Sequence, residues 1–563
     1  MATSLCGNAQ SLATEFKPTS EANPISGCVF CADPTAIEYN GRLYVYGTND
    51  TQQYLKNKKT GGNGYGDIKS LVVFSTDDMV NWTFHGTIDV GKLCASWGWR
   101  FAASWAPSAI WRTTETGQDE FFLYFANSGG SIGVLKASSP VGPWTSPLSK
   151  PMIDGDTPGV KPCNWIFDPG AVIDESGTGW IAFGGGDPQA TGSKLMPGNS
   201  RIAKLKPSMT GLDGAAVNMP APYLFEASEL NVIGGRYVYT YNTSWSDRDD
   251  WSKYAKSNGQ AAPSSCSMCY MVSDTPLNPD SWVYRGEYVP NEGNFGMGWG
   301  NNHTHLQLFK GKYYLFYHST ILEQRMKDKG AMDSDASGYR SLGVDAVKVN
   351  ESTQTISKMT LTTTGVAAVS NVNPFERQEA ETMTTCGGIS YEDFSNINKN
   401  TSISSLGNDA SQNMQVKMAA GSWTMIRNVD FGSAGASGFT VRAKGEGTLE
   451  VRLGRKAAKP VATIPITAED MTDFSIEVDP TKLTGKKSVF LALTSGTGVY
   501  LDAWQATEAS TDGISNRKAN LPACQSYDLS GRRLPTTSQR RGITIEQFTD
   551  GQGVRHSRKS IRP

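Results

Sequence analysis

The chain has 563 residues, which is too long for a single hydrophobic core, so we expect roughly two to four domains. Its formal net charge of −2 at pH 7 excludes a nucleic-acid partner held through phosphates, because such binding needs a clear basic excess. The apolar content of 38% is enough to fold, and no run approaches the roughly eighteen apolar residues of a membrane helix.

The first recognisable pattern is a series of short strands between about residue 30 and residue 350. Each run is rich in Tyr, Val and Phe, and Gly, Asn, Asp or Pro bounds it. The runs are RLYVYGT (42–48), SLVVFST (70–76), EFFLYFA (120–126), GWIAFGG (179–185), RYVYTYN (236–242) and KYYLFYHS (312–319). No amphipathic helix of about a dozen residues interrupts them. Such a series predicts a β-propeller, whose radially repeated sheets protect their edges, but the spacing leaves the blade number open.

The pattern breaks at NVNPFE (371–376), where a Pro predicts a linker. Residues 376–508 again have the pattern of strands, and this length suits a β-sandwich of the lectin-like, jelly-roll kind. The tail from 509 holds ten Lys and Arg against four Asp and Glu, a net charge of about +6. A basic, turn-rich tail predicts a solvated appendage rather than an arm that binds polyanions.

The nine cysteines are an odd number, which argues against a complete disulfide framework. Two pairs have CxxC spacing, Cys28 with Cys31 and Cys266 with Cys269. A zinc site of four cysteines needs two such pairs, but these lie far apart in the chain and lack neighbouring zinc-ribbon glycines or histidines. We interpret them as buried thiols or disulfides.

Three acidic residues stand in apolar settings just before strand-like runs: Asp33 in CADPTAIEYNGRLYVYGT, Asp168 in NWIFDPGAVIDESGTGW and Glu226 in PYLFEASELNVIGGRYVYTY. Inner strand ends of a propeller face the central axis, so distant segments can converge there. Inverting glycoside hydrolysis needs a base and an acid whose carboxyls stand roughly 6.5–9.5 Å apart, and a third carboxylate can raise the acid's pKa. The alternative interpretation of each residue is an ordinary turn or cap.

Seven motifs in order carry a resemblance to a known family. They are ADP (32–34), WAPS (105–108), SIGVLKASSPVGPW (131–144), FDPGAVIDESGTGW (167–180), FEAS (225–228), NNHTHLQLFKGKYYLFYHS (301–319) and GYRSLGVDAVKVNE (338–351). The segment from about 24 to 350 therefore resembles glycoside hydrolase family 43, the five-bladed propeller enzymes. The resemblance implies that Asp33 is the general base and Glu226 the general acid, with Asp168 modulating the acid's pKa and positioning it.

Further residues take implied roles from the same resemblance. His303 falls where relatives have a histidine near the axis, often beside a calcium ion or its water shell, although relatives often have a second histidine at the position of Thr304. Arg340 matches an arginine that hydrogen-bonds the sugar, with a surface salt bridge as the alternative. Trp105 is expected to stack on a sugar ring or to pack in the core. Glu229 competes with Glu226, but residues three apart in a strand point to opposite faces, and the family pattern favours Glu226.

The second domain resembles carbohydrate-binding module family 6 through ERQEAETM (376–383), WTMIRNVDFGS (423–433) and VYLDAWQAT (499–507). The resemblance implies a structural calcium ion held by Glu379, Glu381 and Asp502, whose hard oxygen ligands come from both ends of the domain. Tyr391 is a candidate aromatic wall of a sugar cleft. The opposite Trp is not evident near 468–476, and Tyr500 stands where relatives place an Asn, so a packing role is the alternative.

The prediction is an all-β chain: an N-terminal extension (1–23), a five-bladed β-propeller (24–370), a β-sandwich (376–508) and a basic tail (509–563). The expected activity is inverting removal of α-L-arabinofuranosyl groups from arabinoxylan or a related plant polysaccharide, with no nucleic-acid partner, no membrane span and no organic cofactor. A β-xylosidase is the close alternative, and a non-catalytic glycan-binding propeller is a further one. The N-terminus has no signal-peptide core, but the tail resembles C-terminal segments of exported Bacteroidetes proteins, so we expect a secreted, cell-surface or periplasmic protein.

Overall fold

The computed structural model describes residues 11–186, 192–397 and 414–510, together with three strands of the tail. The chain packs as two compact units, Met1–Glu508 and Ala509–Pro563. In the second unit, β30 (Gln525–Tyr527), β31 (Gly542–Thr549) and β32 (Arg555–Arg562) form one antiparallel sheet. The side chains of the tail lie outside the described residues, so the predicted export role of the tail stays a prediction. Within the described ranges, no helix is long and apolar enough to span a membrane.

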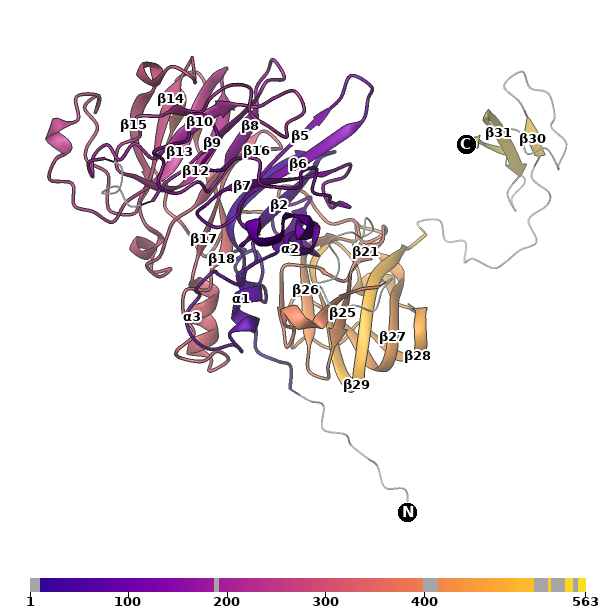
Figure 1. Cartoon of the computed structure of the whole chain (residues 1–563). Coiled ribbons are helices and arrows are strands. Elements are labelled where there is room, and N and C mark those ends of the chain that lie inside the picture. The colour runs from indigo at the N-terminus through magenta and orange to yellow at the C-terminus, as the bar shows by residue number, and fades with distance from the viewer. Residues whose placement is uncertain are drawn as a thin grey trace. The chain divides into compact units, whose positions relative to one another are not determined.

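Five antiparallel sheets form the blades of a propeller (Figure 1). Blade 1 consists of β1 (Ala32–Tyr39), β2 (Arg42–Thr48), β3 (Leu71–Thr76) and β4 (Trp82–Ile88), and blade 2 of β5 (Trp105–Thr113), β6 (Asp119–Ala126) and β7 (Ile132–Ala137). Blade 3 consists of β8 (Gly170–Ile173), β9 (Gly179–Phe183), β10 (Arg201–Lys204) and β11 (Val217–Asn218), and blade 4 of β12 (Leu224–Ile233), β13 (Arg236–Thr243), β14 (Met268–Ser273) and β15 (Val283–Val289). Blade 5 consists of β16 (Thr304–Phe309), β17 (Lys312–Ser319) and β18 (Ser341–Val347). All six predicted strand runs are strands, which confirms the predicted fold class.

Helices in the described propeller are short, as predicted. The α-helices are α1 (Asp50–Lys56), α2 (Val90–Leu93) and α3 (Ile321–Asp328), and the 3-10 turns are η1 (Ala95–Arg100), η3 (Trp251–Lys253), η4 (Pro279–Ser281) and η5 (Glu292–Phe295). Blade-forming hairpins instead depend on tight turns. Asn40-Gly41, which joins β1 to β2, has φ values of 52° and 76°, and the pair Gly234-Gly235 has 56° and 76°. Both residues of each turn lie in the left-handed region, which matches the right-handed twist of the flanking strands.

Side chains on alternate faces of each sheet pack against the two neighbouring blades. On β6, Phe121 and Leu123 join the core with blade 1, whereas Phe122 and Tyr124 join the core with blade 3. This alternation is the period of two of a strand, with both faces buried. The segment before β1 closes the ring, because its backbone bonds to β18: Ile25 N–H donates to the Leu342 carbonyl at 2.8 Å.

The second domain is built on long, bent strands. Its elements are β21 (Gln378–Glu379), β22 (Thr382–Met383), β23 (Thr385–Gly387), η6 (Tyr391–Asp393), β24 (Phe394–Asn396), β25 (Met414–Met418), β26 (Trp423–Asp430), β27 (Ala436–Leu453), β28 (Ala462–Glu477), η8 (Pro480–Lys482) and β29 (Lys486–Glu508), preceded by the small pair β19 (Val349–Asn350) and β20 (Thr355–Ile356). The runs SGFTVRAKG and GTLEVRLG have the pattern of two separate strands, as do KSVFLALTS and VYLDAWQA, but β27 runs through the first pair and β29 through the second. Bulges beside Gly445, with φ of 111°, and Gly496, with φ of 114°, bend these strands without ending them.

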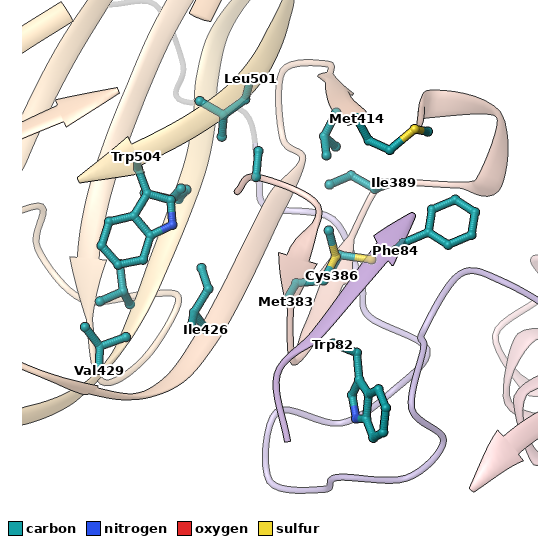
Figure 2. Close-up of a cluster of buried hydrophobic side chains, with 14 of the residues drawn as sticks. Trp82, Phe84, Met383, Cys386, Ile389, Met414, Ile426, Val429, Leu501 and Trp504 are labelled. Carbon is teal, nitrogen blue, oxygen red and sulfur yellow. The ribbon is translucent and has the colours of Figure 1, made fainter. Parts of the chain in front are cut away.

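The propeller and the sandwich share a sheet and a core. β22 pairs with the outer strand β4 of blade 1, with Thr382 opposite Thr83 and Met383 opposite Trp82. One buried cluster holds residues of blade 5, blade 1 and the sandwich together, and Figure 2 shows part of it. The predicted linker is hydrogen-bonded to the sandwich as well, because Val372 N–H donates to the Asn428 carbonyl at 2.9 Å. The cluster that closes the propeller ring is therefore also the core of the sandwich.

Replacing Phe84, which is 2% exposed and lies 5.0 Å from the ring of Phe394, tests this shared core. We expect Phe84→Ala to lower the free energy of unfolding by about 3–5 kcal/mol, because it leaves a cavity at the junction. Calorimetry should show a single unfolding transition that includes both domains, and in the variant this whole transition should move to lower temperature. The matched control Trp299→Ala, at a side chain 64% exposed, should leave the transition in place. Two transitions, of which only one shifts, would contradict a common core.

Candidate active site

A cavity of about 410 Å³ opens at the end of the propeller axis where the inner strands begin. Its lining comes from all five blades: Asp33, Tyr65, Trp105, Ser128, Gly129, Trp165, Phe167, Asp168, Phe225, Glu226, Asn301, Asn302, His303 and Arg340. All six residues predicted to carry the chemistry or to contact the sugar are among them. The propeller thus brings together segments that lie some 300 residues apart, from position 33 to position 340.

A repeated four-residue segment places these groups at the axis. ADPT, WAPS, FDPG and FEAS stand at the starts of the inner strands of blades 1 to 4. Asp33, Ala106 and Asp168 have φ of 50°, 38° and 46°, and Ala227 has φ of 59°. A left-handed residue costs free energy and accompanies a bulge that re-aims its neighbours. Register shifts follow in β1, β5 and β12, so the alternation of an ordinary strand does not apply here.

Asp33 is a carboxylate of the cavity with hydrogen bonds to both of its oxygens. Its Oδ1 accepts a hydrogen bond from Arg340 Nη1 at 2.8 Å, and its Oδ2 accepts one from the Thr48 hydroxyl at 2.7 Å. Its backbone N–H donates to His318 Nδ1 at 3.0 Å, while His318 Nε2 lies 2.8 Å from the carbonyl of Asn301. These partners place the proton of His318 on Nε2. Burial opposes ionisation, but the charge of Arg340 outweighs it and holds the pKa of Asp33 far below its usual range.

The pKa values of the other two carboxyls, Asp168 and Glu226, are raised instead of lowered. Burial and the charge of Asp33 raise the pKa of Asp168 to about 7, although its Oδ2 accepts a hydrogen bond from the Ala227 N–H at 2.8 Å. Burial and the charges of Asp168 and Asp33 raise the pKa of Glu226 to about 8, against one hydrogen bond from Asn242 Nδ2 at 3.2 Å. Near neutral pH the cavity therefore holds one firmly ionised carboxylate and one protonated carboxyl.

His303 lies between two of the acids. Its Nδ1 is 3.7 Å from Asp33 Oδ1 and 4.0 Å from Asp168 Oδ2, beyond hydrogen-bond distance. Burial lowers its pKa to about 4, so the ring is neutral at neutral pH. A neutral imidazole adds no positive charge to the cavity. Among the described residues that line it, only Arg340 carries a permanent positive charge.

Arg340 is not a surface residue, since it is 4% exposed. Its Nε and Nη2 donate to the two oxygens of Asp50, each at 2.9 Å, while Nη1 reaches Asp33. The guanidinium also lies 5.0 Å from the centre of the Tyr65 ring. Arg340 therefore forms a salt bridge, as the alternative interpretation held, but the salt bridge is buried and not on the surface, and it binds Asp33.

The aromatic walls differ in part from the prediction. Trp105 lines the cavity, and its Nε1 donates to the Tyr65 carbonyl at 3.1 Å. A second wall that the sequence analysis missed consists of Trp165, 36% exposed, with Phe167 and Phe225 edge-on at 5.3 and 5.5 Å. Aromatic faces of this kind suit the apolar face of a sugar ring. Trp165 directly precedes the Ile-Phe-Asp segment, which was the available signal.

Glu229 lies away from this cavity. Its Oε1 is 2.9 Å from His305 Nδ1, and both line a separate cavity of about 430 Å³ formed by the inner strands. The register shift between Glu226 and Glu229 separates the two acids along β12. Glu226 alone of the pair faces the cavity that holds Asp33 and Asp168.

Three polar residues around Asp33 were not singled out from the sequence: Thr48, Asp50 and His318. Thr48 and Asp50 flank the end of β2 in GTND (47–50), and His318 ends the apolar run of β17. Asp50 and His318 are fully buried. Polar side chains at the ends of buried strands were the signal that could have found them.

The predicted calcium ligands of the sandwich are three acids that lie close enough to affect one another's charge. Glu381 is 2% exposed, its Oε2 has no hydrogen-bond partner, and burial and the charges of Glu379 and Asp502 raise its pKa well above the usual value. An orphaned buried carboxylate oxygen beside two acids fits a hard divalent cation. Arg377 pairs with Glu379 at 2.8 Å and with Asp502 at 2.9 Å. Across the described residues, no group of three or more His, Cys, Asp or Glu is arranged to hold a metal ion.

Tyr391, the candidate aromatic wall of a sugar cleft, lies at the contact with the propeller. Tyr391 contacts the propeller: its ring lies 6.0 Å from that of Phe84, and its hydroxyl accepts from Asn49 Nδ2 at 3.3 Å. This contact favours the alternative in which the domain packs at this face. The described cysteines, among them the CxxC pairs Cys28–Cys31 and Cys266–Cys269, are free thiols.

A five-bladed propeller with an ionised and a protonated carboxyl in one axial cavity defines the class of a glycosidase. Residues 22–333 match the family model "Glycosyl hydrolases family 43" and residues 379–508 match "Carbohydrate binding module (family 6)". The chain belongs to glycosyl hydrolases family 43.

Two relatives and one solved structure are similar over most of the chain. Arabinoxylan arabinofuranohydrolase of Paenibacillus polymyxa is 35% identical over 87% of this chain and 75% of that protein. The arabinoxylan arabinofuranohydrolase of Bacillus subtilis (strain 168) is 35% identical over 88% of this chain and 94% of that protein. The crystal structure of a Bacillus subtilis arabinoxylan arabinofuranohydrolase in complex with cellotetraose has a TM-score of 0.76 and 33% identity, covering 88% of this chain and 99% of that one.

The raised pKa of Glu226 predicts a pH-dependent stability. Because its folded pKa of about 8 lies above the ordinary glutamate value of 4.5, folding holds the proton more tightly, and stability is lost as pH rises from 4.5 to 8. Glu226→Gln removes this loss, so its free energy of unfolding relative to the wild type should be higher at pH 8 than at pH 4.5. Urea unfolding at both pH values measures the difference. Glu115→Gln, an exposed control, should show no such change, and an equal effect in both variants would refute the assignment.

Proposed function

We propose that this protein is an inverting glycosidase that removes α-L-arabinofuranosyl side groups from arabinoxylan or a related plant cell-wall polysaccharide. The observation that carries the proposal is the divided protonation of the axial cavity, with Asp33 ionised and Glu226 protonated near neutral pH. The named activity of the two relatives that are 35% identical over most of the chain supports the choice of sugar and polymer.

In this proposal Asp33 is the general base. It stays ionised because Arg340 and Thr48 bind its two oxygens, and it takes a proton from a water molecule that attacks the anomeric carbon. Glu226 is the general acid and gives its proton to the leaving oxygen of the polymer. Burial and the charge of Asp168 keep Glu226 protonated until that step. The attack from the face opposite the leaving group inverts the anomeric configuration.

The cavity favours action on a single sugar unit. Its volume of about 410 Å³ lies near the lower end of the range for ligand pockets, roughly 300–1,000 Å³. Trp105, and the pair of Trp165 with Phe225, line the cavity and offer stacking surfaces. A pocket that holds one furanose and opens at the end of the axis suits a side group carried on a polymer chain. A terminal xylose is the second candidate, since it presents similar hydroxyls to such a pocket.

The substrate is tested with matched chromogenic sugars and with the polymer. We expect release from p-nitrophenyl α-L-arabinofuranoside well above that from the β-xyloside, and release of free arabinose from arabinoxylan, with NMR showing the β-anomer first. Asp33→Ala and Glu226→Ala should lower kcat by several orders of magnitude while the fold survives. A faster reaction on the xyloside would favour the β-xylosidase, and no release from either sugar would favour a glycan-binding propeller.

Asp168 should set the alkaline limit of the reaction. Asp168→Asn removes a negative charge beside Glu226, so the pKa of Glu226 falls below its wild-type value of about 8. Because the acid must be protonated, the alkaline limb of the pH profile of kcat/KM is expected to move to lower pH. The profile is measured from pH 5 to 10 on the chromogenic arabinoside. An unchanged alkaline limb would exclude this role, and Asp174→Asn, outside the cavity, serves as the control.

A structural calcium ion in the sandwich is proposed on the orphaned carboxylate oxygen of Glu381. Glu379, Glu381 and Asp502 would hold the ion, which would offset two of their three negative charges and join both ends of the domain. We expect added calcium to raise the unfolding temperature and EDTA to lower it, whereas Glu381→Gln should lose this response. A wild type that is indifferent to both reagents would leave Arg377 as the counter-charge of these acids. A second calcium ion beside His303 rests on the family resemblance alone.

We further propose that the protein acts outside the cytoplasm, as a secreted, cell-surface or periplasmic enzyme. A polymer of the plant cell wall cannot reach a cytoplasmic enzyme intact, so the proposed substrate supports this location. Fractionation of the native cells with an antibody against the chain would test it, and recovery in the cytoplasmic fraction alone would contradict it.

A further inference from the structure

Asp50 is the buried group whose placement the proposed reaction does not yet explain. It is the first residue of α1, it is 0% exposed, and it does not line the cavity. Its Oδ2 accepts from the backbone N–H of Arg340 at 3.0 Å and from Nε at 2.9 Å, and its Oδ1 accepts from Nη2 at 2.9 Å. Both oxygens are therefore committed to one residue.

The geometry of these bonds determines how Arg340 meets Asp33. A guanidinium prefers to bind a carboxylate with two parallel N–H groups. Asp50 holds the edge formed by Nε and Nη2, and this fixes the angle at which the guanidinium presents Nη1 to Asp33 Oδ1, at 2.8 Å. The second oxygen of Asp33 is bound by the Thr48 hydroxyl instead, and that hydroxyl accepts from the Ala106 N–H at 2.8 Å.

Asp50 also balances charge. The titratable groups around Arg340 and the cavity are Cys31, Asp33, Asp50, Tyr65, Asp168, Glu226, Glu292, His303 and His318. Arg340 lowers the pKa of both Asp168 and Glu226. Without a second carboxylate on it, its charge would act more strongly on both groups.

We propose that Asp50 is a positioning residue for Asp33: it holds Arg340 so that one N–H alone contacts the base, and it offsets the charge that Arg340 directs into the cavity. This inference rests on the proposed function, in which Asp33 accepts the proton of the attacking water. With one bond from Arg340 on Oδ1 and one from Thr48 on Oδ2, each oxygen of Asp33 keeps a second lone pair for that water. A bidentate pair with Arg340 would add a second donor on Oδ2 and leave that oxygen no lone pair.

The test compares Asp50→Asn with Asp50→Glu, which keeps the charge, and with Asp345→Asn, a buried aspartate of β18 bonded to Thr362 and remote from the cavity. We expect Asp50→Asn to lower kcat on the order of 100-fold on the chromogenic arabinoside, because a small misplacement of a reacting group has that effect. KM should change little, since Asp50 does not line the cavity. The alkaline limb of the pH profile should move to lower pH in Asp50→Asn and stay in place in Asp50→Glu and Asp345→Asn.

A second measurement does not depend on turnover. The wild type loses stability between pH 4.5 and pH 8 because Asp168 and Glu226 ionise with difficulty. Asp50→Asn should reduce this loss, since Arg340 then favours their ionised forms. A wild type without glycosidase activity would refute the proposed function while leaving this measurement intact. An unchanged stability profile in Asp50→Asn, or a kcat loss and pH profile equal to those of Asp50→Glu, would refute the role of Asp50 and leave the proposed function standing.

Discussion

The site depends on one buried cation shared between two carboxylates. Arg340 is bound to Asp50 through two nitrogens and to Asp33 through the third, and all three side chains are buried. A buried charge is costly unless it is paired and hydrogen-bonded, and here every charged partner is satisfied. The same charge acts unequally on the three cavity acids. It holds Asp33 ionised, while Asp168 and Glu226 receive too little of it to offset burial and mutual repulsion.

This distribution of charge requires that the side chains be held rigidly, and two blades of the propeller, the first and the last, hold them. Arg340 lies directly before β18 of the last blade, whereas Asp33 and Asp50 belong to the first, so the ion pair forms at the point where the ring closes. The core at this closure includes the sandwich, whose strand β22 extends the first blade. Asn49, the cap of α1, also contacts Tyr391 of the sandwich. The second domain therefore supports the elements that carry Asp33 and Asp50, in addition to any binding function.

Much of the architecture could be read from local patterns, because strands of a propeller alternate and end at tight turns. The six strand runs, the short helices and the two β-domains follow from that periodicity. The continuous strands β27 and β29 did not, since a glycine in a strand signals either a turn or a bulge and only the pairing partner decides between them. The packing of Tyr391 against the propeller likewise depends on a neighbour some 300 residues away in sequence.

Local patterns in the chain were enough to predict the fold class, the family and the cavity acids Asp33, Asp168 and Glu226, because apolar surroundings and ordered motifs are local properties. The sequence by itself did not determine what holds these acids. Thr48, Asp50 and His318 are ordinary residues at strand ends until the ring closes and places them around Asp33. The tertiary structure also shows which of Glu226 and Glu229 faces the cavity, because a register shift in β12 separates them. Long-range pairing decides both, since the electrostatic environment of a carboxyl depends on groups that tertiary structure alone brings near it.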